Sequence, residues 1–266
     1  NEARLAHANL GNAWLQGTRL SNTMLEHADL RGADLTGADL SNAALRNARL
    51  DGAVLDAAVL RDADLRLLDL RKVAGLRDTD LSGARLNKAK LDGLDLSGNR
   101  LDGADMLQAS LVGTRLNNAS LVRTNLRRTN MKDADLREAD LREANMKGAQ
   151  LKGVQLKSAN LEQAKLAGNL IGADFSDGRL AKADLSGANL KDALFHNADL
   201  RQANFTSCNL YGADFSGAKL ERASFRKANL RNAIFEGADL SGVIFDDARG
   251  APVPAKQQRP ATQAGR

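Results

Sequence analysis

The stretch ADLRGADLTGADL, at residues 28–40, contains the pattern that decides the fold of this chain. A leucine, methionine or phenylalanine recurs every fifth residue from Leu5 to Phe245, and alanine usually stands two places before it. An amphipathic helix has a period near 3.6 residues and a strand a period of 2, so neither puts these apolar residues on one face. A unit of five residues must instead turn a corner once per repeat.

We call the every-fifth residue the centre of its repeat. The centres fall in three runs, 5–70, 76–166 in a shifted register, and 170–245, which together make about 49 repeats. One residue is added in LDLRKVAGL, near 70–76, and one is missing in LAGNL, near 166–170. Because one repeat pattern continues through both slips, we expect a single elongated domain over residues 1–247.

The large centre and the small residue before it both need exclusion from water, and the other three positions of each repeat are mostly polar. Four units that each turn one corner close a square coil of roughly 20 residues, and stacking at about 4.8 Å would give about 12 coils. Glycine is frequent two places after the centre, where a tight turn needs positive φ. These features predict an all-β solenoid.

The units ADLRGADLTGADL, ADLREADLREAN and ADLSGANLKDALF resemble the A(D/N)LXX units of the pentapeptide-repeat family. The resemblance covers about residues 3–248 and implies a right-handed quadrilateral parallel β-helix. Some members of that family protect DNA gyrase from quinolones, which implies a rod that mimics duplex DNA through an acidic surface. Those members typically form dimers through a C-terminal helix.

The phenylalanines test the length of the coil. All seven are centres at or after Phe175. A 20-residue coil stacks Phe175, Phe195, Phe215 and Phe235 on one side, and Phe205, Phe225 and Phe245 on the opposite side. We predict two inward aromatic ladders in the core rather than an aromatic ligand groove.

Two polar or reactive residues occupy the small buried position. Cys208 stands where alanine usually does, so we interpret it as a structural thiol and not a nucleophile. Asn99 stands there as well, and because a buried amide needs hydrogen-bond partners, we expect local distortion around residues 94–106.

Motifs of enzymes and of metal or cofactor sites are missing from the sequence. It contains no phosphate loop, no serine elbow and no metal-ligand spacing. We interpret His7, His27 and His196 as surface residues far apart in the array. The many Asp residues follow the repeat pattern and no cleft selects them. We therefore expect no catalytic residue, no cofactor, no metal and no enzymatic activity.

The outward charges are unevenly distributed although the net charge is only +5. If the two slips preserve the four-repeat cycle, the outward charges on one side of the rod sum to about +5 and those on the opposite side to about −6. The candidate partner-binding basic side consists of Arg85, Lys88, Arg127, Arg128, Lys147, Lys165, Arg226 and Lys227. We expect a protein partner. Nucleic acid is less favoured because Asp residues interrupt the cations and only Trp14 and Tyr211 are outward aromatics.

Residues 248–266 contain all three prolines and an excess of cations, which predicts a flexible basic tail. No helical pattern with an apolar face follows Phe245, so a dimer, if one forms, is not expected to use a C-terminal helix. No apolar run approaches the roughly 18 residues of a transmembrane span, and no signal segment opens the chain, which predicts a soluble, cytoplasmic protein. The absence of a distinct N-terminal cap suggests one region of a longer polypeptide.

The sequence therefore predicts a non-enzymatic interaction or scaffold rod of bacterial type that binds a protein partner through its outward side chains. Two alternatives stay open: a DNA mimic that acts on a topoisomerase such as gyrase, and an interaction module of a secreted effector.

Overall fold

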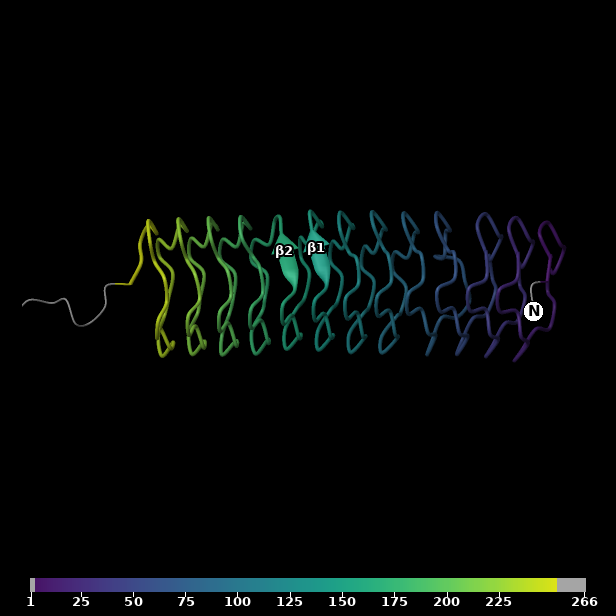
Figure 1. The fold of residues 1–266 in the computed structure, drawn as a ribbon, viewed down its shortest axis with the longest axis horizontal. Helices are drawn as coiled ribbons and strands as arrows, with labels where there is room; N and C mark the ends of the chain where they lie inside the picture. Colours follow the sequence, from purple (N-terminus) through teal and green to yellow (C-terminus); the bar gives the residue numbers. More distant parts are fainter. Residues whose placement is uncertain (1–2, 253–266) are drawn as a thin grey trace, which may run out of the picture.

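The computed structural model describes residues 3–252. They form a rod of stacked square coils, and the chain advances along the long axis without turning back (Figure 1). Residues one coil apart pair in parallel at four places per coil, beginning with Arg4 and Met24, Asn9 and Asp29, Trp14 and Asp34, and Arg19 and Asp39. We call these the first, second, third and fourth sides. The predicted right-handed quadrilateral β-helix is confirmed.

Only two segments of the described chain are extended enough to count as strands. β1 (Asn145–Lys147) and β2 (Lys165–Ala167) pair in parallel, with Asn145 opposite Lys165. Elsewhere each side makes a single-residue bridge before the chain turns again. β2 is followed by the place where one residue is missing, and there the chain stays extended for longer because the turn is shorter.

A regular repeat satisfies four of its five N–H groups through the main chain. The centre and the residue two places after it donate to the next coil, the residue before the centre donates to the previous coil, and the small residue donates back within its own turn. Around the centre Leu30 these bonds are Leu30 N to Arg49 O, 2.9 Å; Gly32 N to Asp51 O, 3.0 Å; Asp29 N to Ala8 O, 2.9 Å; and Ala33 N to Leu30 O, 3.1 Å.

The fifth N–H, on the residue after the centre, is bound by a side chain in repeats that have Asp or Asn before the centre. Asp29 Oδ1 accepts the N–H of Arg31 at 3.3 Å, and Asp39 Oδ1 accepts that of Ser41 at 3.0 Å. Asparagine does the same, since Asn204 Oδ1 accepts from its i+2 neighbour Thr206 at 3.0 Å. Asp and Asn are the residues that bind their own backbone two places on. This bond is the physical reason for Asp or Asn before the centre.

The core consists of the centres and the small residues, as the repeat predicts. Phe195 and Phe215 stack with ring centroids 4.8 Å apart, whereas Phe195 and Phe205 meet edge to face at 5.6 Å and 86°. The two inward ladders are therefore confirmed, and they also contact each other across the narrow core. Five of these rings are fully buried, namely Phe175, Phe195, Phe205, Phe215 and Phe225.

The distortion expected around residues 94–106 is found at Asp95, which forms no bridge with Gly75 of the previous coil among the described residues, but not at Asn99 itself. Asn99 is 1% exposed, and its Nδ2 donates to the carbonyl oxygen of Leu76 at 2.7 Å. The bridge between Arg100 and Ser120 on the next coil is kept. Thr124 uses the same arrangement, with its Oγ1 donating to Leu101 O at 2.8 Å. The small position thus faces a carbonyl of the previous coil that accepts a second hydrogen bond, so short polar residues fit without bending the chain.

The residue two places after the centre adopts positive φ, as the glycines predict. Gly187 has φ 72°, but Glu138 (60°), Arg128 (56°) and Leu67 (65°) adopt the same conformation. A residue with a Cβ is disfavoured there by roughly 1–2 kcal/mol. The corner therefore imposes this conformation on whichever residue occupies it.

Both register slips leave the four sides in order. At the first slip, Val54 pairs with Gly75, one residue more than a full coil, and the extra length is taken up around the exposed Ala74. At the second slip, Lys165 pairs with Asp184, one residue less than a full coil. The first and fourth sides are consequently continuous along the described rod, whereas bridges are missing on the second side between Arg49 and Asp69 and between Gln150 and Asn169, and on the third side between Gly75 and Asp95.

The C-terminal coil extends past the expected boundary at residue 247, because Arg249 still pairs with Asn229. Most of the predicted flexible tail, residues 253–266, lies outside the described residues, as do residues 1–2. In the part of the chain that the structure describes, no helix is long and apolar enough to span a membrane.

Cys208 is 2% exposed, and its Sγ donates to Leu185 O at 3.0 Å. Burial raises the pKa of the thiol to about 12. The thiolate, which is the reactive form, is therefore scarce in the folded protein.

We expect Leu141→Asp to destabilise the rod by about 3 kcal/mol or more, since Leu141 is 0% exposed and the charge would be buried without a partner. Ile171→Asp is the control, because Ile171 is 48% exposed. Thermal unfolding followed by circular dichroism measures both. Equal melting temperatures for Leu141→Asp and the wild type would contradict the burial scheme.

We expect Cys208 to resist a thiol reagent such as dithionitrobenzoate in native buffer and to react fully in concentrated urea, because unfolding exposes the thiol and restores its ordinary pKa. Absorbance of the released thiolate measures the reaction. Full reaction of the native protein within minutes would show that the coil opens there.

Candidate partner-binding surface

The structure brings the eight residues of the predicted basic side onto one side of the rod. Arg85 and Lys165 lie in the ladder of the first side, and the other six lie at the corner that follows it. Asp64 pairs with Arg85 across the first slip, and Lys165 with Asp184 across the second. The slips thus preserve the four-repeat cycle. All eight side chains are exposed.

These eight residues form three groups along the rod. Arg127, Arg128, Lys147 and Lys165 lie on three neighbouring coils around β1 and β2, and the N–H of Arg128 donates to Lys147 O at 3.2 Å. We call these four residues the central cluster. The pair Arg85 and Lys88 lies toward the N-terminal end, and the pair Arg226 and Lys227 lies several coils toward the other end.

Half of the arginines that directly follow a centre are neutralised by the residue before the same centre. In every Asp-Leu-Arg repeat the guanidinium forms a two-pronged pair with the carboxylate, with Nε 2.7–2.9 Å from Oδ1. The pairs are Asp29–Arg31, Asp64–Arg66, Asp69–Arg71, Asp135–Arg137, Asp140–Arg142 and Asp199–Arg201. The Arg71 hydrogen bonds lower the pKa of Asp69 to about 2. Sequence reasoning missed these pairs, although their spacing is visible in the sequence.

The basic side is different because its repeats have no carboxylate before the centre. Arg127 follows Asn125, and Lys147 follows Asn145. Among residues 3–252, ion pairs reach Arg85 (Asp64, 3.9 Å), Lys147 (Asp184, 3.2 Å) and Arg226 (Asp246, 3.2 Å). No residue among 3–252 forms an ion pair with the other five cations of the basic side, which are Lys88, Arg127, Arg128, Lys165 and Lys227. Their charges are available to a partner.

The third side, opposite the basic side, carries the excess of acidic residues, but several of these are already paired. Asp95 binds Arg115 at 2.8 Å, and Asp214 binds His196 at 3.0 Å. The hydrogen bond from Arg115 holds the pKa of Asp95 well below its usual range. The carboxylates on this side therefore do not form a continuous unpaired row.

The expectation that the histidines lie far apart is wrong for two of them. His7 and His27 are one coil apart, and their rings stack with centroids 4.8 Å apart and planes within 1°. Residues that are 20 apart occupy equivalent positions on adjacent coils, except across the two register slips. Among the described residues no three His, Cys, Asp or Glu side chains are grouped to hold a metal.

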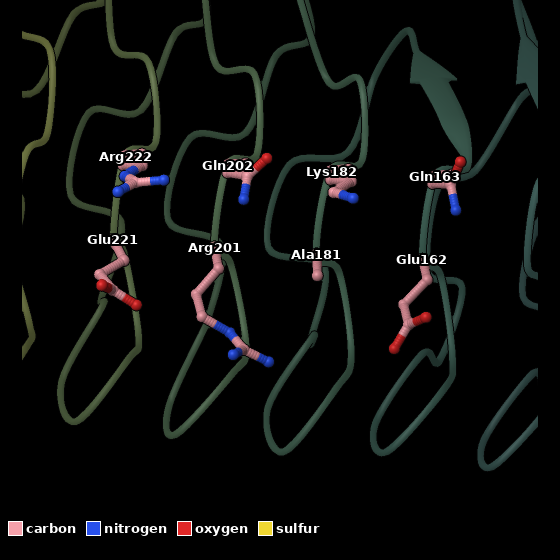
Figure 2. A pocket seen from close by; sticks show the side chains of 8 residues that line it. All are labelled: Glu162, Gln163, Ala181, Lys182, Arg201, Gln202, Glu221 and Arg222. Atoms are coloured by element: carbon pink, nitrogen blue, oxygen red, sulfur yellow. The ribbon is translucent and has the colours of Figure 1, made fainter.

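A shallow polar groove crosses four coils at the corner after the fourth side. Figure 2 shows its side chains in two rows, one residue of each row per coil, pointing outward and not toward a common point. Glu162 accepts Arg179 Nη2 at 2.6 Å, and Arg201 is held by Asp199 at 2.5 Å. Charges held this way do not form an acid–base pair around a reacting atom, so the groove lacks the geometry of a catalytic site.

Comparison with known proteins gives a family and several structural matches. A model of pentapeptide repeats matches in eight copies, over residues 3–42, 38–73, 79–118, 119–157, 169–206 and 208–247. HetL, a pentapeptide repeat protein involved in heterocyst differentiation regulation from the cyanobacterium Nostoc sp. strain PCC 7120, is 30% identical, with 89% of this chain and 90% of HetL covered and a TM-score of 0.30.

Two further solved structures share the repeat. A trypsin-treated form of QnrB1, a plasmid-mediated fluoroquinolone resistance protein, is 16% identical over 84% of this chain and 89% of its own, with a TM-score of 0.35. A pentapeptide repeat protein from the Arabidopsis thaliana thylakoid lumen is 30% identical over 50% of this chain and 73% of its own, with a TM-score of 0.12. No curated protein matches the sequence. The family model spans most of the described coils, and this chain belongs to the pentapeptide-repeat family.

Proposed function

We propose that this protein is a non-enzymatic interaction rod, or scaffold, that binds an acidic protein partner through its basic side. The observation that carries this proposal is the set of five cations that share one side of the rod and form no ion pair among residues 3–252, whereas the arginine of every Asp-Leu-Arg repeat is neutralised by its own aspartate. Unpaired surface cations attract an acidic surface and accelerate its association.

Two features of the basic side favour a protein over a nucleic acid. Asp105 and Asp184 lie in the same ladder as Arg85 and Lys165, and carboxylates would repel a phosphate backbone that tracks along it. The exposed aromatic residues Trp14 and Tyr211 lie on other sides, so no base-stacking platform accompanies these cations. The cations of the basic side, held on a rigid scaffold, suit recognition of a protein surface.

We place this function in the cytoplasm of a bacterium. The support is the lone cysteine, Cys208, which leaves the chain without an internal disulfide. No feature of the described surface favours the secreted-effector alternative. The DNA-mimic alternative is weakened by the ion pairs on the acidic third side, since duplex DNA presents unpaired phosphates at regular spacing.

We expect Arg127→Glu combined with Arg128→Glu to reduce recovery of acidic proteins by about tenfold in a quantitative pull-down from a lysate of the source cells. The matched control is Lys152→Glu combined with Arg231→Glu, which makes the same change of charge on the second side. Circular dichroism checks that both variants fold. Equal recovery by the two variants would contradict binding through the basic side.

We expect micromolar protein to leave supercoiling by purified DNA gyrase unchanged, with or without a quinolone. Relaxed and supercoiled plasmid are separated on an agarose gel. Inhibition of supercoiling, or protection from the drug, would instead favour the DNA-mimic alternative.

A further inference from the structure

Leu67 is an unusual residue at the corner between the first and second sides. It is 56% exposed, the most exposed aliphatic side chain among the large hydrophobic residues of the described chain. It also has φ 65°, and among residues 3–252 it is the one large apolar residue with positive φ at a corner. Glycine, Asn, Asp, other polar residues and the small Ala57 fill that place elsewhere among the described residues. The coil therefore holds a leucine in a disfavoured conformation and presents it to water.

The surroundings of Leu67 are basic. It lies in a surface groove of about 340 Å³ together with Arg46, Arg66, Arg85, Asn87, Lys88 and Asp105. Asn87 and Lys88 come from the next coil, whose Asn87 O accepts the N–H of Leu67 at 3.1 Å. An apolar floor with cations around it is consequently formed by adjacent coils.

Some charged side chains in this groove form ion pairs or hydrogen bonds within the protein, and others form no ion pair. Asp64 holds Arg66, with Nε to Oδ1 at 2.7 Å, and is 3.9 Å from Arg85. Asp105 accepts from Asn87 Nδ2 at 2.6 Å. Within residues 3–252, Arg46 and Lys88 have no ion pair, so the rim keeps an excess of positive charge.

We propose that this groove, the Leu67 groove, anchors a segment of the protein partner in which an apolar side chain is flanked by carboxylates. This inference rests on the proposed function and names the chemistry that the basic side recognises. The apolar side chain packs on Leu67, while the carboxylates reach Arg46 and Lys88. A nucleic acid strand would satisfy the cations but would leave Leu67 without an apolar contact.

The positive φ of Leu67 makes a clean test available. Leu67→Gly removes the side chain at a position where glycine is the preferred residue, so the variant is expected to fold with an unchanged or higher melting temperature. Ile171→Gly is the matched control, because it also removes an exposed aliphatic side chain, at a corner that has no part in this groove.

The probes are two fluorescein-labelled heptapeptides with blocked ends, in which either leucine or serine lies between two runs of three glutamates. Fluorescence anisotropy at low salt measures their dissociation constants. We expect the wild type and Ile171→Gly to bind the leucine peptide at least about fivefold more tightly than the serine peptide. Leu67→Gly should bind both peptides equally, and Arg46→Glu with Lys88→Glu should weaken both.

Three results would overturn the groove as an anchor. The first is equal binding of the two peptides by the wild type, and the second is a leucine preference that survives in Leu67→Gly. The third is a DNA duplex that displaces both peptides and binds Leu67→Gly as well as the wild type. The pull-down with the Arg127 and Arg128 variant is independent of Leu67, so it shows whether the proposed function survives such a result.

Discussion

The structure depends on one constraint, which is that a five-residue unit must turn a corner and still give main-chain partners to the N–H groups that join it to its own turn and to the neighbouring coils. Main-chain acceptors take four of the five N–H groups of a regular repeat, three in neighbouring coils and one within the turn. The fifth is accepted by a side chain where Asp or Asn stands before the centre, as Asp29 does for Arg31. Asp and Asn favour this turn because they bind their own backbone two places on, which ties the choice of residue to the turn.

The same Asp or Asn also decides the charge of the surface. An Asp before the centre can bind a following arginine as well as its N–H, so Arg137 is neutralised by Asp135. An Asn accepts the N–H but carries no charge, so Arg127, which follows Asn125, keeps a free guanidinium. Turn chemistry and partner recognition are therefore set by the same outward position. Arg127 and Arg128 are two such free cations on the first side, one coil before β1.

Much of the fold was predictable because every repeat must bury the same two positions and turn the same corner. The buried centres, the phenylalanine ladders and the inward Cys208 all follow from counting in steps of five and twenty. One expectation was wrong because the residues were not counted in steps of twenty: His7 and His27 are one coil apart and stack. The distortion expected around residues 94–106 lies at Asp95, whereas Asn99 fits a carbonyl of the previous coil. The location of the basic side could be predicted, whereas the pairing of its individual cations could not.

The sequence by itself determined the square coil, its core and the order of its four sides, because a short period leaves few ways to bury a leucine in every repeat. Only the tertiary structure decided which charges are paired and which remain free, since ion pairs such as Lys147 with Asp184 join residues nearly two coils apart. It also decided that Leu67 is exposed at positive φ beside Arg46 and Lys88. Those contacts depend on how neighbouring coils align, which the period of five does not specify.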